Sequence, residues 1–125
     1  MWRSLADMQT FLRARPNLEV ADLEPAVDHL VNVFGFEVEL REEEMGLALL
    51  RRDGVILAVV RTPSPAVNET TAIYVDVSEV DDLHATCLER GAKVVNPLTE
   101  HPWHLRDFVV EIPGGHRLVF GQRVG

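Results

Sequence analysis

The sequence has a single cysteine, Cys87, which excludes an internal disulfide and any metal site built from cysteines alone. Cys87 lies in an apolar helical pattern, so we expect a buried, unreactive thiol rather than a nucleophile. The chain also lacks any apolar run approaching the roughly 18 residues of a membrane-spanning helix. Its first residues lack the uninterrupted apolar stretch of a signal peptide. We therefore expect a cytoplasmic protein without a membrane partner.

Positive charge is scarce, because 12 Lys and Arg residues stand against 20 Asp and Glu residues, for a net charge of −8. Binding to nucleic acid requires a surplus of Lys and Arg on some face, so we expect no nucleic-acid partner. The sequence also contains no Gly-rich phosphate loop and no nucleophile elbow. The acidic balance fits simple solubility, and its overall field would favour a cationic ligand.

The 125 residues, 46% of them apolar, are enough for one domain with a substantial core. Within this domain the chain repeats itself. The first half reads "NLEVADLEPAVDHLVNVFGFEVEL" and the second reads "AIYVDVSEVDDLHATCLERGAKVV". Each half contains an alternating strand, an acidic step, a helix, a glycine and a second strand. The repeat predicts two modules of the same architecture.

Local signals mark the ends of the two helices. Asp22 precedes the first helix as a capping residue, and Gly35 ends it. Ser78 and Asp81 form a capping box for the second helix, which stops at Gly91. Further strands follow each helix, joined by tight turns at 53–54 and 113–115. These strands are predicted at 36–42, 45–52 and 54–61 in the first half, and at 93–95, 106–112 and 116–122 in the second.

The predicted fold is therefore α+β, with a strand-helix-strand-strand-strand order in each half. Residues 1–14 are predicted as an N-terminal helical extension, in which Ser4 and Asp7 are spaced as a capping box. Residues 15–61 form the first module, 62–70 the linker and 71–122 the second module. A long loop over 96–105 carries two histidines and a tryptophan, and loops of this length are often functional.

Three segments carry a resemblance to a known family: "VADLEPAVDHLVNVFGFEVE", "VDVSEVDDLHATCLERGAKVV" and "WHLRDFVVEIPGGHRLVF". In order and spacing the chain resembles the vicinal oxygen chelate superfamily of glyoxalases, bleomycin-resistance proteins and extradiol dioxygenases. The resemblance implies two paired βαβββ modules whose curved mixed sheets surround a cleft, with the helices outside. It also implies a homodimer, often with a cleft shared or completed across the subunits.

Enzymes of this superfamily hold a divalent cation with His, Gln or Glu side chains on the concave sheet faces. The matching positions in this chain are Arg15, Ala58, Ala72 and Val119. None of these side chains offers a lone pair to a metal, and the Arg guanidinium is always positively charged. We therefore expect that the metal site of the family is lost and that the protein has no metal cofactor.

The histidines suggest no obvious replacement site. His29 and His84 fall on the predicted helices, where we expect them to be exposed, and His116 begins a strand after a turn, where turn hydrogen bonding would explain it. His101 and His104 have a spacing that can bind metal. A zinc site normally needs three or four ligands, so a further ligand would have to come from elsewhere.

Strand alternation, applied to the implied fold, names the residues that would face the cleft. The apolar floor would come from Ile56, Ala58 and Val60. For each residue singly, packing in the core remains the alternative, and Glu19 could also act as a base or balance the charge of Arg15. The predicted ligand-binding residues are Arg15, Asn17, Glu19, Tyr74, Trp103, Arg106 and Phe108.

An apolar cleft with aromatic walls and a few polar groups is typical of a small-molecule site. Our leading hypothesis is a non-catalytic protein that sequesters an antibiotic-like ligand, resembling the bleomycin-resistance branch. Arg15 and Arg106 depart from the pattern expected for a cationic drug. The alternatives are a metal-dependent glyoxalase- or dioxygenase-like enzyme with displaced ligands, and a regulatory module that acts through its dimer surface.

Overall fold

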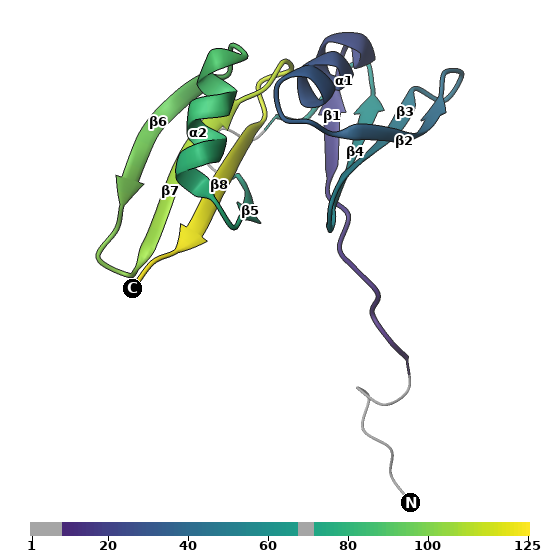
Figure 1. Ribbon diagram of the computed structural model, residues 1–125. Helices are drawn as coiled ribbons and strands as arrows, with labels where there is room; N and C mark the ends of the chain where they lie inside the picture. Colours follow the sequence, from purple (N-terminus) through teal and green to yellow (C-terminus); the bar gives the residue numbers. More distant parts are fainter. Residues whose placement is uncertain (1–8, 68–71) are drawn as a thin grey trace, which may run out of the picture.

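A computed structural model describes residues 9–67 and 72–125 of the chain. It contains the predicted repeat: two modules, each with the order βαβββ (Figure 1). The first module comprises β1 (Asn17–Val20), α1 (Leu23–Asn32), β2 (Glu37–Glu42), β3 (Leu47–Arg52) and β4 (Val55–Arg61). The second comprises β5 (Ile73–Asp76), α2 (Val80–Glu89), β6 (Lys93–Glu100), β7 (Leu105–Glu111) and β8 (Arg117–Arg123).

Each module forms one four-stranded mixed sheet, and the two sheets have equivalent topology. Sheet A has the order β1-β4-β3-β2, and sheet B has the order β5-β8-β7-β6. In each sheet the first strand pairs in parallel with the last, and the other pairs are antiparallel. The α+β fold predicted from the sequence is confirmed, and among the described strands neither sheet closes into a barrel.

The helices pack their apolar stripes on one face of their own sheets. In α1 the buried side chains include Ala26 and Leu30, which share a core with Ala48 and Leu50 of sheet A. In α2 the fully buried Cys87 lies in the same continuous core. Burial raises the pKa of the Cys87 thiol to about 11. We call the face of each sheet that lies opposite its helix the outer face.

The start of α2 differs from the prediction. Its capping position is Glu79 rather than Ser78, and the backbone N–H of Val80 donates to the side-chain oxygen of Gln122 on β8. A side chain from a neighbouring strand therefore satisfies a free N–H at the helix start, which sequence spacing alone does not reveal. Asp22 does precede α1, as predicted, but makes no side-chain capping bond within the described residues.

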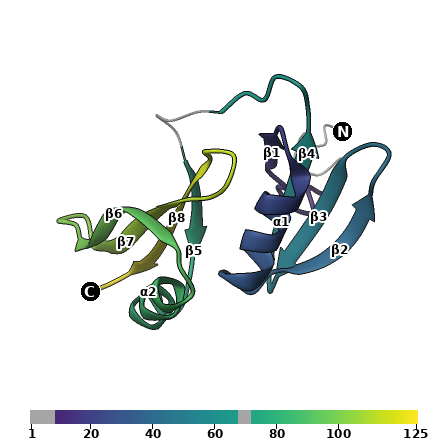
Figure 2. The same ribbon diagram turned by 90° about the horizontal axis from the view of Figure 1, so that it is seen from above.

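The two modules lie side by side and share one hydrophobic core (Figure 2). Phe34, after α1, packs against Phe120 of β8 with ring centroids 5.3 Å apart. The turn at 113–115 also reaches the first module, where His116 Nε2 donates to the backbone carbonyl of Glu19 at 2.6 Å. His116 is therefore buried between the modules and not merely part of its own turn.

Two other predictions about histidines were wrong. His29 and His84 are partly buried instead of exposed, because each ring packs edge-on against a phenylalanine. His29 contacts Phe34 with centroids 5.5 Å apart, and His84 contacts Phe108 at 4.9 Å. Burial lowers the pKa of His29. Both histidines therefore contribute to packing between helix and core.

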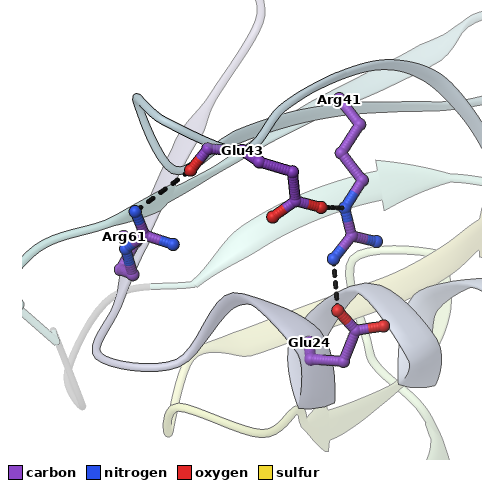
Figure 3. A network of polar contacts seen from close by, with 4 residues as sticks. All are labelled: Glu24, Arg41, Glu43 and Arg61. Carbon is purple, nitrogen blue, oxygen red and sulfur yellow. Dashed lines mark hydrogen bonds and ion pairs between the residues drawn. The ribbon is translucent and has the colours of Figure 1, made fainter.

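A polar network fixes the β2–β3 hairpin to α1 (Figure 3). Arg41 on β2 forms ion pairs with Glu24 on α1 and with Glu43 in the turn, and these hydrogen bonds raise the pKa of Arg41. Arg61 donates to the carbonyl of Glu43 at 3.2 Å and crosses over Gly46. Exposed ion pairs contribute little to the free energy of unfolding, so we infer that the network mainly orients the hairpin.

Two segments differ from their predicted structure. Residues 9–16 form no helix and run away from both modules as an irregular arm (Figure 1). The first part of the predicted N-terminal helix, residues 1–8, lies outside the described residues. The predicted loop over 96–105 is shorter, because β6 continues to Glu100 and leaves a turn at 101–104. No helix among the described residues is long and apolar enough to cross a membrane.

Candidate functional site on the outer face of sheet B

The outer face of sheet B is defined by strand alternation. Val75 and Phe120 are paired across β5 and β8, and both are buried on the side of α2. Their neighbours Tyr74 and Gly121 therefore lie on the opposite, outer face. Asp107 pairs with Gly121, so it lies on this face too. Side chains of β5 and β7 can meet here if β8, which lies between them, leaves room.

Gly121 provides that room. Tyr74 crosses β8 and donates its hydroxyl hydrogen to Asp107 Oδ2 at 3.0 Å. A Cβ atom at Gly121 would lie 1.9 Å from the Tyr74 hydroxyl oxygen, so the ring position requires glycine. Burial, and next the hydrogen bond to Asp107, raise the pKa of Tyr74 to about 12.

Asp107 also orients His101. His101 Nε2 lies 2.8 Å from Asp107 Oδ1, and it donates the hydrogen because the carboxylate is the acceptor. In a neutral ring Nδ1 is then left as a hydrogen-bond acceptor. Each carboxylate oxygen of Asp107 therefore has one partner, either Tyr74 or His101, and the side chain is only 14% exposed.

Trp103 stacks on the imidazole of His101. The ring centroids are 4.5 Å apart and the planes are within 4° of parallel. Even so, Trp103 remains 62% exposed. The turn beneath it is fixed by a bond from the His104 N–H to the His101 carbonyl, and His104 has the left-handed φ of 67°. The indole is thus a fixed aromatic surface that faces solvent.

The structure brings some of the predicted ligand-binding residues together and places others elsewhere. Tyr74 and Trp103 lie at the site, joined through His101 and Asp107. We predicted that Arg106 and Phe108 face the cleft, and this was wrong. Arg106 donates to Asp81 on α2 at 2.8 Å, and Phe108 is fully buried under the same helix.

The cause is an error of one residue in the alternation of β7. Because successive side chains point to opposite faces, this error inverts the whole strand. Asp107, which the prediction missed, takes the outer position between Arg106 and Phe108. The buried Val110 and Ile112, in phase with Phe108, are the signal that would have given the correct face.

The remaining predicted residues lie on the first module. Glu19 Oε1 accepts a hydrogen bond from the backbone of Ala66 in the linker at 2.8 Å. Asn17 pairs with Ala58 on sheet A, and Arg15 is exposed on the arm. Glu19 is thus bonded to the linker and Asn17 is paired within sheet A, and neither contacts Trp103.

The positions that correspond to the metal ligands of the family do not fit a metal. Ala58 and Val119 lie on the outer faces of their sheets and carry no donor atoms. Among residues 9–67 and 72–125, no group of three or more His, Cys, Asp or Glu side chains is placed to hold an ion. The two groups of histidines are too far apart to share an ion. His101 and His116 lie beyond opposite ends of β7, and a strand of this length spans about 20 Å.

A second feature lies between the two modules. We call it the intermodule groove, a cavity of about 960 Å³ between the end of α1, β4, β5 and α2. Its apolar floor includes Phe34, Phe36, Ile56, Val75, Leu83 and Phe120. Its charged lining residues are Arg52, Asp53, Asp76, Glu79, Asp82 and Arg90. Tyr74 is common to this lining and to the predicted ligand-binding set.

The repeated βαβββ modules with open mixed sheets define a two-module α+β class of protein. A sequence profile of the Glyoxalase/Bleomycin resistance protein/Dioxygenase superfamily matches residues 14–120. The chain belongs to this superfamily, as the resemblance indicated. No curated protein gives a significant match.

Solved structures support the same assignment. TioX from Micromonospora sp. ML1 is 32% identical, with a TM-score of 0.75, over 91% of this chain and 100% of that one. The bleomycin-binding protein from bleomycin-producing Streptomyces verticillus, solved with copper(II)-bleomycin, is 27% identical with a TM-score of 0.74. That match covers 94% of this chain and 99% of the other. A superfamily member from Nocardioides, 21% identical over 96% of this chain and 88% of that one, has a TM-score of 0.74 and shows the shared fold.

Proposed function

We propose that the protein binds a planar aromatic small molecule on the outer face of sheet B and does not transform it. The observation that carries this proposal is the exposed indole of Trp103, stacked on a histidine that Asp107 holds in place. A rigid aromatic ring with free surface favours stacking, because little conformational freedom is lost when the ligand binds. The bleomycin-binding relative supports a ligand of the antibiotic type.

The polar groups beside the indole narrow the ligand further. In its neutral form the His101 ring offers Nδ1 as an acceptor, and the Asp107 carboxylate lies on the other side of that ring. The net charge of −8 adds a field of the same sign. We therefore propose a ligand that combines a planar ring with a positive charge or a hydrogen-bond donor.

We further infer a homodimer in which a second copy covers the apolar outer face of sheet A. Leu40 is 47% exposed on this face, beside its pairing partner Leu49 and the neighbouring pair Leu47 and Val60. An open apolar face of this kind favours an interface. In such a dimer Arg15, Asn17 and Glu19 would reach the ligand only from the partner protomer.

Fluorescence titration tests the ligand site. In a Trp2→Phe background Trp103 is the sole tryptophan, so its emission reports stacking directly. The probes are copper(II)-bleomycin, metal-free bleomycin and ethidium. We expect at least one probe to quench the emission. Variants without Trp103 lack this reporter, so their binding is measured by isothermal titration calorimetry. Trp103→Ala should weaken binding of the same probe about tenfold or more, since stacking on an aromatic ring contributes about 1–3 kcal/mol. Trp103→Phe should retain most of the affinity.

A matched control is Leu88→Ala, which removes an apolar side chain that is 50% exposed on α2. It should leave the affinity unchanged, and mass spectrometry should recover the probe chemically intact. Equal binding by Trp103→Ala would contradict the assigned site. A tight Zn²⁺ or Ni²⁺ site, or a converted probe, would contradict a non-catalytic, metal-free function.

A further inference from the structure

Arg117, the first residue of β8, is a partly buried cation without an ion-pair partner among the described residues. Its Nε is buried and has no hydrogen-bond partner there, and none of the ion pairs that these residues form includes it. A guanidinium carries five N–H donors and a permanent positive charge. Burying such a group without an acceptor costs free energy, so an unpaired arginine marks a position where an anion or water can bind.

Two carboxylates on neighbouring elements are already held by other groups. Glu111 pairs with Arg117 across β7 and β8, but its Oε2 accepts a hydrogen bond from Lys93 Nζ at 2.6 Å. Glu19 Oε1, on β1, accepts a hydrogen bond from the backbone N–H of Ala66 at 2.8 Å. Neither carboxylate therefore neutralises the Arg117 guanidinium through an ion pair.

Arg117 lines a small pocket of about 240 Å³ at the junction of β1, the linker, β5 and β8, which we call the linker pocket. Its apolar lining residues are Pro16, Leu18, Ala66, Ala72 and Ile73, and its polar ones are Asn17, His116 and Arg117. His116 uses its Nε2 in the hydrogen bond to the Glu19 carbonyl. Among the described lining residues Arg117 is the only Lys or Arg, and none is Asp or Glu. The linker pocket is thus an apolar site with one permanent positive charge.

This combination favours a small anion that carries one negative charge and an apolar body. A carboxylate matches the planar fork of the guanidinium and can accept two parallel hydrogen bonds from it. A phosphate dianion would bring a second charge, for which the described lining offers no further permanent cation. Sites for drug-sized ligands measure about 300–1,000 Å³, so a pocket of this size suits a short acid better than an antibiotic.

We propose that the linker pocket binds a short-chain monocarboxylate. The carboxylate lies on the terminal nitrogens of Arg117, and the chain packs against Ala72 and Ile73. Because β1 and β8 both line the pocket, the bound acid contacts both modules. Arg117 lies four residues before Gly121 on β8, a rise of roughly 13 Å, so this site is separate from the one at Trp103. The inference goes beyond the proposed function and does not depend on it.

NMR of the arginine side chains tests the contact. The Nε–H signal of Arg117 is assigned by its loss in Arg117→Gln. The probe is isobutyrate, which has no aromatic ring to stack on Trp103, and the neutral isobutyramide of the same shape is its control. At constant ionic strength we expect isobutyrate to shift this signal saturably at millimolar concentration, and isobutyramide to leave it in place. An equal response to both probes, or an Nε–H that contacts water and does not respond to isobutyrate, would overturn the proposal.

The backbone amide shift of Ile73 gives the dissociation constant in variants that lack the Arg117 signal. Arg117→Gln should raise this constant at least tenfold, whereas Arg123→Gln, an exposed change on the same strand, should not alter it. Ala66→Asp should raise it at least threefold through charge repulsion, and the neutral Ala66→Asn should not. Equal constants for Arg117→Gln and the wild type, or for the two Ala66 variants, would overturn the proposal. Trp103→Ala should bind isobutyrate normally, so failure of this site and failure of the proposed function are distinguishable.

Discussion

At the scale of single residues, the candidate site depends on Asp107 and Gly121. Asp107 holds both His101 and Tyr74, and Gly121 allows the tyrosine to cross β8. The aromatic members, Tyr74 and Trp103, were predictable because alternation and loop position point to them. Asp107 was not predicted, because the phase of β7 had been assigned one residue out. Asp107 lies between Arg106 and Phe108, which resemble a family motif, and assigning those two to the cleft placed Asp107 on the wrong face.

The environment of Tyr74 predicts an unusual titration. Tyr74 is the only tyrosine of the chain, so tyrosinate absorbance reports it alone. We expect a midpoint near the pKa of about 12, against about 10 for free tyrosine. Between about pH 10 and 12 the folded state retains a proton that the unfolded state has lost, so this group makes stability fall as pH rises across that window.

Asp107→Asn serves as the comparison for this titration. It removes the charge and weakens the acceptor, so the midpoint should fall, yet stay above 10 because burial is the larger cause. The chain in denaturant should titrate near 10. A folded wild-type midpoint near 10 would show that Tyr74 is neither buried nor bonded to Asp107 in solution.

At the scale of elements, helices and most strands follow from the sequence, because apolar periodicity and glycine stops mark them. The sequence did not predict where β6 ends. Its segment "NPLTE" contains Pro97, which argues against a strand, but β6 is an edge strand and its pairing is irregular between Asn96 and Thr99. The length of this strand therefore depends on its partner β7, which local patterns do not reveal.

The turn at 113–115 predicts a graded series of glycine substitutions. Gly54 has open space around it, Gly91 has open space but a φ of +90°, and Gly114 combines a φ of +101° with a close neighbour. A Cβ at Gly114 would lie 2.8 Å from Val20 Cγ1 of the other module. Gly54→Ala should change stability by less than about 0.5 kcal/mol. Gly91→Ala should cost about 1–3 kcal/mol.

Gly114→Ala should cost the same strain and about 1–3 kcal/mol more, because the added methyl group overpacks the contact between the modules. Urea denaturation of the three variants measures the series, with equal m-values as the check that unfolding stays comparable. If Gly114→Ala and Gly91→Ala were equally destabilising, the docking of this turn on β1 would contribute nothing.

At the scale of the whole molecule, the sequence indicates two modules but not how they are joined. The joint is made by long-range contacts such as Phe34 with Phe120, and periodicity within one module does not show them. The predicted cleft residues are for this reason split between the modules, and the intermodule groove was not predicted. The same contacts make one core of two repeats, which determines how the chain should unfold.

That shared core predicts a single unfolding transition. Phe34 is almost fully buried between the modules, so Phe34→Ala should destabilise the protein by about 3–5 kcal/mol. Because Phe34 belongs to the first module and Trp103 to the second, Trp103 fluorescence in the Trp2→Phe background should report the same loss as far-ultraviolet circular dichroism. Val38→Ala, at an exposed position of β2, should have little effect. Two separate transitions, or a Trp103 signal unmoved by Phe34→Ala, would mean that the modules fold independently and that their contact adds little to stability.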